Sequence, residues 1–332
     1  MPTGAGRRPV RRRRSVDRPA QGGLISRPLF LSNWENTMLT RRNVMKAAAG
    51  ALAATSAGFA MAAGRLAWRH LPAGETGFYR APVLLSGGSE AMLIDGGFTY
   101  SDGRKVVEAI RATGKTLTTI YVSQSDPDYY FSLKPITTAF PNARVLAASA
   151  TIAAIRGNVE KKLAVWGPQL KDNGPQSLAD IVIPDSFDGA TLHVDGAAVE
   201  IVAADELANR RTLFVPDLNA VFGGVLIFAG VHVWTADTPE KTQRASWRAN
   251  LEKLSARKPA IVVPGHMATA AATDGSAIAF TLAYLTAFEE ELARAANAAA
   301  LKAAMEARFS GLGMGIALDI GSKVATGEMK WG

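Results

Sequence analysis

Two short segments combine side chains that can carry out acid–base or nucleophilic chemistry, and each follows a predicted strand. Residues 123–128 read Ser-Gln-Ser-Asp-Pro-Asp after the apolar run 117–122, and His266 follows a Pro-Gly pair after the run 260–263. A serine nucleophile in the first segment would need a base, and His266 is the candidate for that base. A simpler interpretation is that the Asp-Pro-Asp sequence at 126–128 forms a turn and begins a helix, because aspartate caps helices well and proline suits the first helical turn.

Four segments, in chain order, resemble the metallo-β-lactamase superfamily. Residues 120–131, Ile-Tyr-Val-Ser-Gln-Ser-Asp-Pro-Asp-Tyr-Tyr-Phe, resemble the family's signature, in which a strand ends in His-x-His-x-Asp-His. Leu-Ile-Asp-Gly-Gly at 93–97, Ala-Val-Phe-Gly-Gly-Val at 220–225 and Val-Val-Pro-Gly-His at 262–266 are similar to three further family segments. The resemblance covers residues 77–332. It implies an α+β fold, a four-layer αββα sandwich of two mixed β-sheets, with the site along one edge.

In this family the signature residues hold metal ions, which lower the pKa of a bound water that attacks an ester, amide or phosphoester. This sequence departs from the signature at most positions. Gln124 replaces the first histidine, Asp126 the second and Tyr129 the last, whereas the aspartate is kept as Asp128. The run Gln-x-Asp-x-Asp-Tyr also has the form of a divergent subfamily motif.

The remaining ligands of the family are only partly present. Val225 replaces the bridging aspartate, and the third histidine has no counterpart, since residues 205–206, Asp-Glu, are the nearest candidates. His266 matches the terminal histidine. The resemblance therefore implies one metal ion at most, held by Asp126, Asp128 and His266. Zn²⁺, Mn²⁺ or Fe would suit this oxygen-rich set, and a protein without metal is the alternative.

Two hypotheses about function follow. The first is an exported metal-dependent hydrolase of small ester, lactone or amide substrates, in which Asp128 binds the metal, Tyr129 ligates it or acts as an acid, and Gln124 orients water or substrate. The second is a metal-free pseudoenzyme that binds a small-molecule ligand in the same cleft. A metalloprotein would lose stability when a chelator removes its metal, whereas a metal-free binder would not respond.

The body of the chain alternates predicted strands and helices and then continues as a β-meander. Short apolar runs bounded by turn residues predict strands, and apolar residues at helical spacing predict helices. This order of elements fits a fold in which helices cover the outer faces of two packed sheets. The expected strands are 81–85, 91–95, 117–122, 144–148, 181–183, 190–194, 198–202, 212–215, 220–222 and 260–263, and the expected helices are 103–113, 129–139, 150–165, 238–255 and 277–308.

Residues 38–62 have the layout of a secretory signal, with a basic start, an Ala/Gly-rich apolar run and a small-x-small end. The pair Arg41-Arg42 resembles the twin-arginine export signal. We therefore expect the twin-arginine export machinery as a partner and a periplasmic or secreted product after cleavage near Ala62. No stable membrane span is expected, because the apolar run is too short and too rich in alanine and glycine.

The expected domain organisation has four parts. Residues 1–37 are rich in arginine, proline and glycine and are predicted to be a disordered basic extension. Because export signals stand at the N-terminus, Met38 is the hypothesised true start. The signal at 38–62 is followed by a linker at 63–76 and by the metallo-β-lactamase-like domain at 77–332.

The net charge of +8 does not indicate nucleic-acid binding, because the excess lies in the leader. Residues 1–62 hold eleven of the 37 basic residues and two of the 29 acidic ones, which leaves 26 basic and 27 acidic residues and a net charge of −1. The body therefore has no basic excess for binding a phosphate backbone. The chain has no cysteine, which excludes disulfides, thiolate zinc ligands and a cysteine nucleophile.

Overall fold

A computed structural model describes residues 66–331 of the chain. The predicted basic extension at 1–37 and the predicted export signal at 38–62 lie outside the described residues. In the described part, no helix has both the length and the apolar character that crossing a membrane requires.

The first half of the described chain forms a six-stranded mixed sheet in the order β1-β2-β3-β4-β5-β6. Strands β1 to β3 are antiparallel to their neighbours, and β3 to β6 run parallel. The central segments 92–94 and 120–122 are fully buried, as expected for parallel strands that are covered on both faces. The strands are β1 Ala67–His70, β2 Val83–Ser86, β3 Glu90–Ile94, β4 Thr116–Val122, β5 Arg144–Ala147 and β6 Asp185–Ser186.

The second half forms a five-stranded mixed sheet in the order β12-β10-β9-β8-β7. Strand β12 runs parallel to β10, and the other neighbours are antiparallel. A short parallel pair, β11 and β13, lies apart from this sheet in the hydrogen-bonding pattern. The strands are β7 Thr191–Val194, β8 Ala197–Ala203, β9 Arg211–Val215, β10 Ala220–Phe222, β11 Phe228–Ala229, β12 Ile261–Val263 and β13 His266–Met267.

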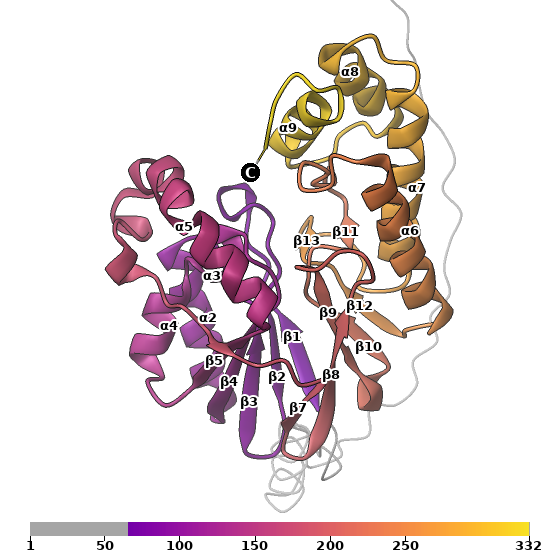
Figure 1. Cartoon of the computed structure of the whole chain (residues 1–332). Coiled ribbons are helices and arrows are strands. Elements are labelled where there is room, and N and C mark those ends of the chain that lie inside the picture. Colours follow the sequence, from indigo (N-terminus) through magenta and orange to yellow (C-terminus); the bar gives the residue numbers. More distant parts are fainter. Residues whose placement is uncertain (1–65, 332) are drawn as a thin grey trace, which may run out of the picture. The chain divides into compact units, whose positions relative to one another are not determined.

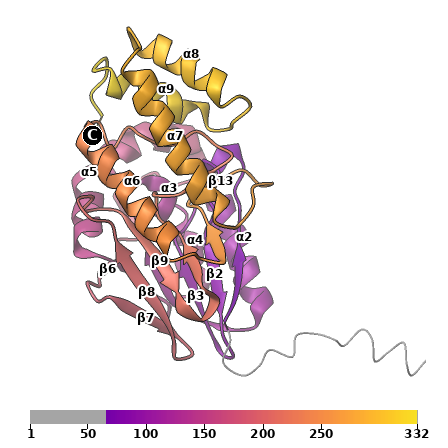
Figure 2. The ribbon, with the colours of Figure 1, turned by 90° about the vertical axis from the view of Figure 1, so that its right-hand side faces the viewer.

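Helices cover the outer face of each sheet (Figure 1). Figure 2 shows α6 and α7 crossing the strands of the second sheet. Between the sheets, Trp68 of β1 packs against Phe222 of β10 with ring centroids 5.7 Å apart. The result is the predicted αββα sandwich. The helices are α2 Tyr100–Thr113, α3 Pro127–Tyr130, α4 Leu133–Ala139, α5 Ser149–Leu170, α6 Lys241–Ala256, α7 Ser276–Leu292, α8 Ala298–Arg308 and α9 Gly315–Ala325.

Three predicted elements differ from the structure. No strand forms at 181–183, and a two-residue strand follows at Asp185–Ser186 instead. The helix expected at 129–139 is divided into α3 and α4, because the backbone N–H of Ser132 donates to the carbonyl of Gly97 at 3.0 Å. The range 63–76, expected to be a linker, contains β1, whose charged and polar residues conceal the strand pattern.

The long helix expected at 277–308 was also wrong, since the structure has α7 and α8 with a break at 293–297. The side chain of Asn297 accepts a hydrogen bond from the N–H of Ala300 at 2.9 Å and so caps α8. The alanine-rich sequence gives no apolar signal for this break. Helix α9 was not expected either.

Two glycines bring the backbones after β10 and β12 into direct contact. A Cβ atom on Gly265 would lie 1.7 Å from the carbonyl oxygen of Gly224. Gly224 has a positive φ of 74°, a conformation that glycine adopts without steric cost. This contact sets the position of the segment that carries His266.

We expect Gly265→Ala to lower the free energy of unfolding by about 3 kcal/mol, because the new methyl group meets backbone that cannot yield cheaply. The matched control is Gly275→Ala, where no atom lies within 4 Å of the added Cβ, and its effect should stay within about 0.5 kcal/mol. Urea unfolding followed by circular dichroism measures both values. Equal stability of the two variants would contradict the proposed role of the backbone contact between Gly224 and Gly265.

Candidate functional site

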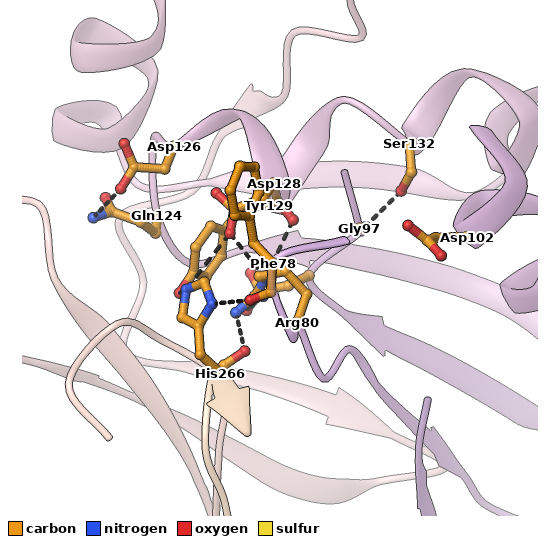
Figure 3. A network of polar contacts seen from close by, with 12 residues as sticks. Phe78, Arg80, Gly97, Asp102, Gln124, Asp126, Asp128, Tyr129, Ser132 and His266 are labelled. Atoms are coloured by element: carbon orange, nitrogen blue, oxygen red, sulfur yellow. Dashed lines mark hydrogen bonds and ion pairs between the residues drawn. The ribbon is translucent and has the colours of Figure 1, made fainter. Parts of the chain in front are cut away.

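The candidate site lies where four strands end. Asp95 and Ser123 directly follow the parallel strands β3 and β4, and Gly224 and His266 lie two and three residues after the parallel strands β10 and β12. Because the carboxyl ends of parallel strands meet at one edge of a sheet, these segments from the two halves of the fold come together. Figure 3 shows the polar contacts that result.

Asp95 links the two sheets through Ser123. Its carboxylate accepts hydrogen bonds from the backbone N–H of Ser123 at 2.7 Å and from the Ser123 hydroxyl at 2.8 Å. The same hydroxyl oxygen accepts the N–H of Gly224 at 3.1 Å. Asp95 is fully buried, and burial raises its pKa, opposed by Arg80 and by these hydrogen bonds. The carboxylate therefore depends on nearby positive charge to stay ionised.

That positive charge is the guanidinium of Arg80, which is completely buried at the centre of the site. One terminal nitrogen lies 3.3 Å from Asp95 Oδ2. Nε donates to the carbonyl oxygen of Asp128 at 3.2 Å and lies 3.8 Å from its Oδ2. The other terminal nitrogen donates to the carbonyl of Gly265, and the group lies over the ring of Tyr129 at 3.4 Å. All three nitrogen positions are used.

Backbone geometry places Arg80 there. Phe78 and Tyr79 both have positive φ values, 54° and 56°, and they turn the chain toward β13. The N–H of Met267 donates to the carbonyl of Tyr79 at 2.8 Å, and the N–H of Ala81 donates to the carbonyl of Gly265 at 3.1 Å. Sequence reasoning missed Arg80, because a single basic residue in a loop carries no pattern that indicates burial.

His266 is held as a neutral imidazole. Its Nδ1 donates to the carbonyl of Phe78 at 2.7 Å, and its Nε2 lies 3.3 Å from the Tyr129 hydroxyl. Burial and the charge of Arg80 lower its pKa to about 3. The 3.5 Å separation between Nε2 and Asp128 Oδ2 is therefore not an ion pair at neutral pH. Burial raises the pKa of Asp128 to about 6.

The structure brings together three of the five predicted site residues. Asp128, Tyr129 and His266 contact one another around Arg80, whereas Gln124 and Asp126 lie to one side (Figure 3). Gln124 Nε2 donates to Asp126 Oδ2 at 3.4 Å. The roles assigned to these residues from the sequence stay predictions.

The side chains of this site do not form a ligand set for a divalent metal. Within residues 66–331, no three His, Cys, Asp or Glu side chains are grouped closely enough to hold an ion. An ion next to Asp128 and His266 would also compete with the guanidinium of Arg80 for the carboxylates of Asp95 and Asp128. The two carboxylates already have a cation, and it belongs to the chain.

A narrow cleft of about 50 Å³ opens beside these residues. Asp126, Asp128 and His266 form its polar wall, and the sequence analysis identified all three. Aromatic and aliphatic side chains form most of the rest. Trp234 was considered from the sequence either as part of the cleft rim or as a core residue, and it lines the cleft. Trp166, Ile320 and Trp331 also line the cleft and were not identified from the sequence.

Lys162 of α5 also lies at this cleft. Its Nζ is 3.8 Å from Asp126 Oδ1 and 4.7 Å from the centroid of the Trp331 ring. Burial and the neighbouring charge of Asp237 raise the pKa of Asp126 well above its usual range, and Lys162 opposes the rise. Asp126 is thus paired with an ammonium group, as Asp128 is with a guanidinium.

No protein-family model matches the chain, and no curated protein sequence matches it. Solved structures are similar to it. A beta-lactamase domain protein from Burkholderia ambifaria has a TM-score of 0.55 at 16% identity, over 81% of this chain and 88% of that one. A metallo-beta-lactamase family protein from Thermus thermophilus has a TM-score of 0.52 at 14% identity, over 79% and 93%. A metallo-beta-lactamase from Pontibacter korlensis has a TM-score of 0.50 at 18% identity, over 68% and 97%.

At these identities the similarity concerns the arrangement of elements and carries no information on activity. The two mixed sheets, the helices on their outer faces and the meeting of the strand ends agree with the order of segments noted in the sequence. The described part of this chain has the metallo-β-lactamase fold.

Proposed function

We propose that this protein is a metal-independent member of the metallo-β-lactamase fold that binds a small molecule in the cleft beside Asp128 and His266. The observation that carries the proposal is the buried guanidinium of Arg80, which contacts Asp95 and Asp128. A permanently attached cation compensates the two carboxylates that would otherwise attract a metal ion.

Substitutions at the family's ligand positions support the same proposal. Gln124 and Val225, in two of the family's ligand positions, supply an amide and an aliphatic group, neither of which binds zinc well.

The lining of the cleft is suited to contact with a small molecule. Aromatic rings make up much of the wall, and small-molecule sites are mostly apolar with a few placed polar groups. The polar groups here include Asp126, Asp128 and Lys162. The sequence also suggested a metal-dependent hydrolase. That hypothesis requires a bound metal ion, whereas this proposal does not, and the difference can be measured.

Metal analysis tests this difference directly. The full chain, expressed with added zinc, manganese and iron, should contain no metal above the buffer background, and EDTA should leave its melting temperature unchanged. Elemental mass spectrometry and differential scanning fluorimetry measure the two quantities. One bound equivalent that His266→Ala removes would refute the proposal and favour the hydrolase.

Removing the internal cation should destabilise the fold. We expect Arg80→Ala to lower the free energy of unfolding by about 3–5 kcal/mol, because it leaves buried carboxylates without their partner. Arg69→Ala is the control, since Arg69 is exposed on the neighbouring strand β1, and its effect should be within about 0.5 kcal/mol. Urea denaturation measures both. A loss in Arg80→Ala no larger than in the control would show that Arg80 does not hold the site.

A further inference from the structure

A second cavity lies next to the cleft and is large enough for a small organic molecule. Its volume is about 490 Å³, within the usual range for ligand sites. It shares Asp126, Lys162 and Trp331 with the cleft. Its other polar lining includes Asn158 of α5 and, from the loop before β9, Asn209 and Arg210.

Arg210 is the unusual member of this lining. It is only 4% exposed, and among residues 66–331 neither of its terminal nitrogens has a hydrogen-bond partner. Its guanidinium lies over the ring of Trp247 at 4.1 Å, and that ring is fixed because its Nε1 donates to the carbonyl of Leu226 at 2.8 Å. A buried guanidinium without acceptors is costly, so an acceptor is expected from the cavity.

The carboxylates nearby are already used by other groups. The two oxygens of Asp237 accept the indole N–H groups of Trp234 and Trp331 at 3.0 and 2.8 Å. Asp126 faces Lys162. Arg210 therefore has the charge of Asp126 and Asp237 in its surroundings without a hydrogen bond from either.

Two amide oxygens of residues that line the same cavity also lack partners among the described residues, those of Asn158 and Asn209. These oxygens need hydrogen-bond donors, whereas the terminal nitrogens of Arg210 need acceptors. A ligand that satisfies both has an anionic oxygen pair at one end and a hydroxyl or amide N–H group near it. The planar fork of a guanidinium matches a carboxylate through two parallel hydrogen bonds.

The charged residues of the cavity favour a carboxylate over a phosphate as the bound anion. Lys162 and Arg210 bring positive charge, but Glu206, Asp126 and Asp237 also line the wall. A phosphate dianion would meet this acidic lining, whereas a single carboxylate adds the least repulsion. We propose that the cavity binds a small monocarboxylate that carries a hydroxyl or amide group, with Arg210 holding the carboxylate. This inference rests on the function proposed above, because it names the class of ligand for the same connected space.

Calorimetric titration of the full chain tests it with two matched pairs of probes. N-acetylglycine and lactate should bind, and N-acetylglycinamide and lactamide should bind about tenfold more weakly or worse, since they lack the charged acceptor. Inorganic phosphate should bind no better than the amides. Equal affinity for acids and amides, or stronger binding of phosphate, would overturn the proposal.

Variants then assign the binding to Arg210. Arg210→Gln should weaken N-acetylglycine by about tenfold or more, and Arg210→Lys should weaken it too, because it keeps the charge but loses the fork. Arg257→Gln is the matched control, since Arg257 also lies over an aromatic ring, Phe214, at 4.7 Å and lies outside this cavity. If Arg210→Gln fails to fold by circular dichroism, Arg210→Lys and the acid–amide comparison decide. Unchanged binding in a folded Arg210 variant refutes the assignment.

Metal analysis of the same samples separates the two proposals. Carboxylate binding that EDTA abolishes would overturn both, because the ligand would then be held by an ion. A metal-free protein that does not distinguish acids from amides would overturn the Arg210 site alone.

Discussion

The ion pairing of Arg80 with Asp95 and Asp128 is the interaction on which the candidate site depends. Asp95 follows β3 and Asp128 lies in α3 after β4, and the carbonyl of Gly265 contacts the same guanidinium from the second half of the fold. A buried carboxylate without a partner would take up a proton or destabilise the fold. The arginine therefore keeps the strand ends of both halves in one polar network.

This network also explains why the residues around it are so constrained. The Asp95–Ser123–Gly224 chain of hydrogen bonds crosses between the sheets, and Gly265 has no room for a side chain where the two backbones meet. A shift of either segment would break contacts to Arg80 on one side and to Ser123 on the other. The conformation of the site is thus set by long-range contacts, and the sheets supply the rigid frame for them.

The fold and part of the site could be predicted from the sequence, because the patterns that indicate them involve residues close together in the chain. Strands β3 and β4 are short apolar runs followed by turn residues, and His266 follows such a run after a Pro-Gly pair, so all three were found. The break between α7 and α8 was missed, because the capping side chain of Asn297 stands in a sequence of alanines that reads as one helix.

Arg80 and Arg210 were missed for a different reason. Arg80 is separated from Asp128 by 48 positions and from Gly265 by 185, and no pattern in its neighbours reports contacts over that distance. The resemblance to a metal-binding family drew attention to residues that could be ligands, which are acids and histidines. The cation that pairs with Asp95 and Asp128 is found only when the chain is folded.

A guanidinium and a metal ion differ in the chemistry that they bring to buried carboxylates. Both compensate buried carboxylates, but a metal has open coordination positions that bind water and lower its pKa, which an arginine lacks. The arginine in return cannot dissociate, so the site keeps its geometry without a supply of ions. The cleft beside it adds aromatic surface and polar side chains. Because the arginine is attached to the chain, the charge balance of the site is as stable as the fold itself.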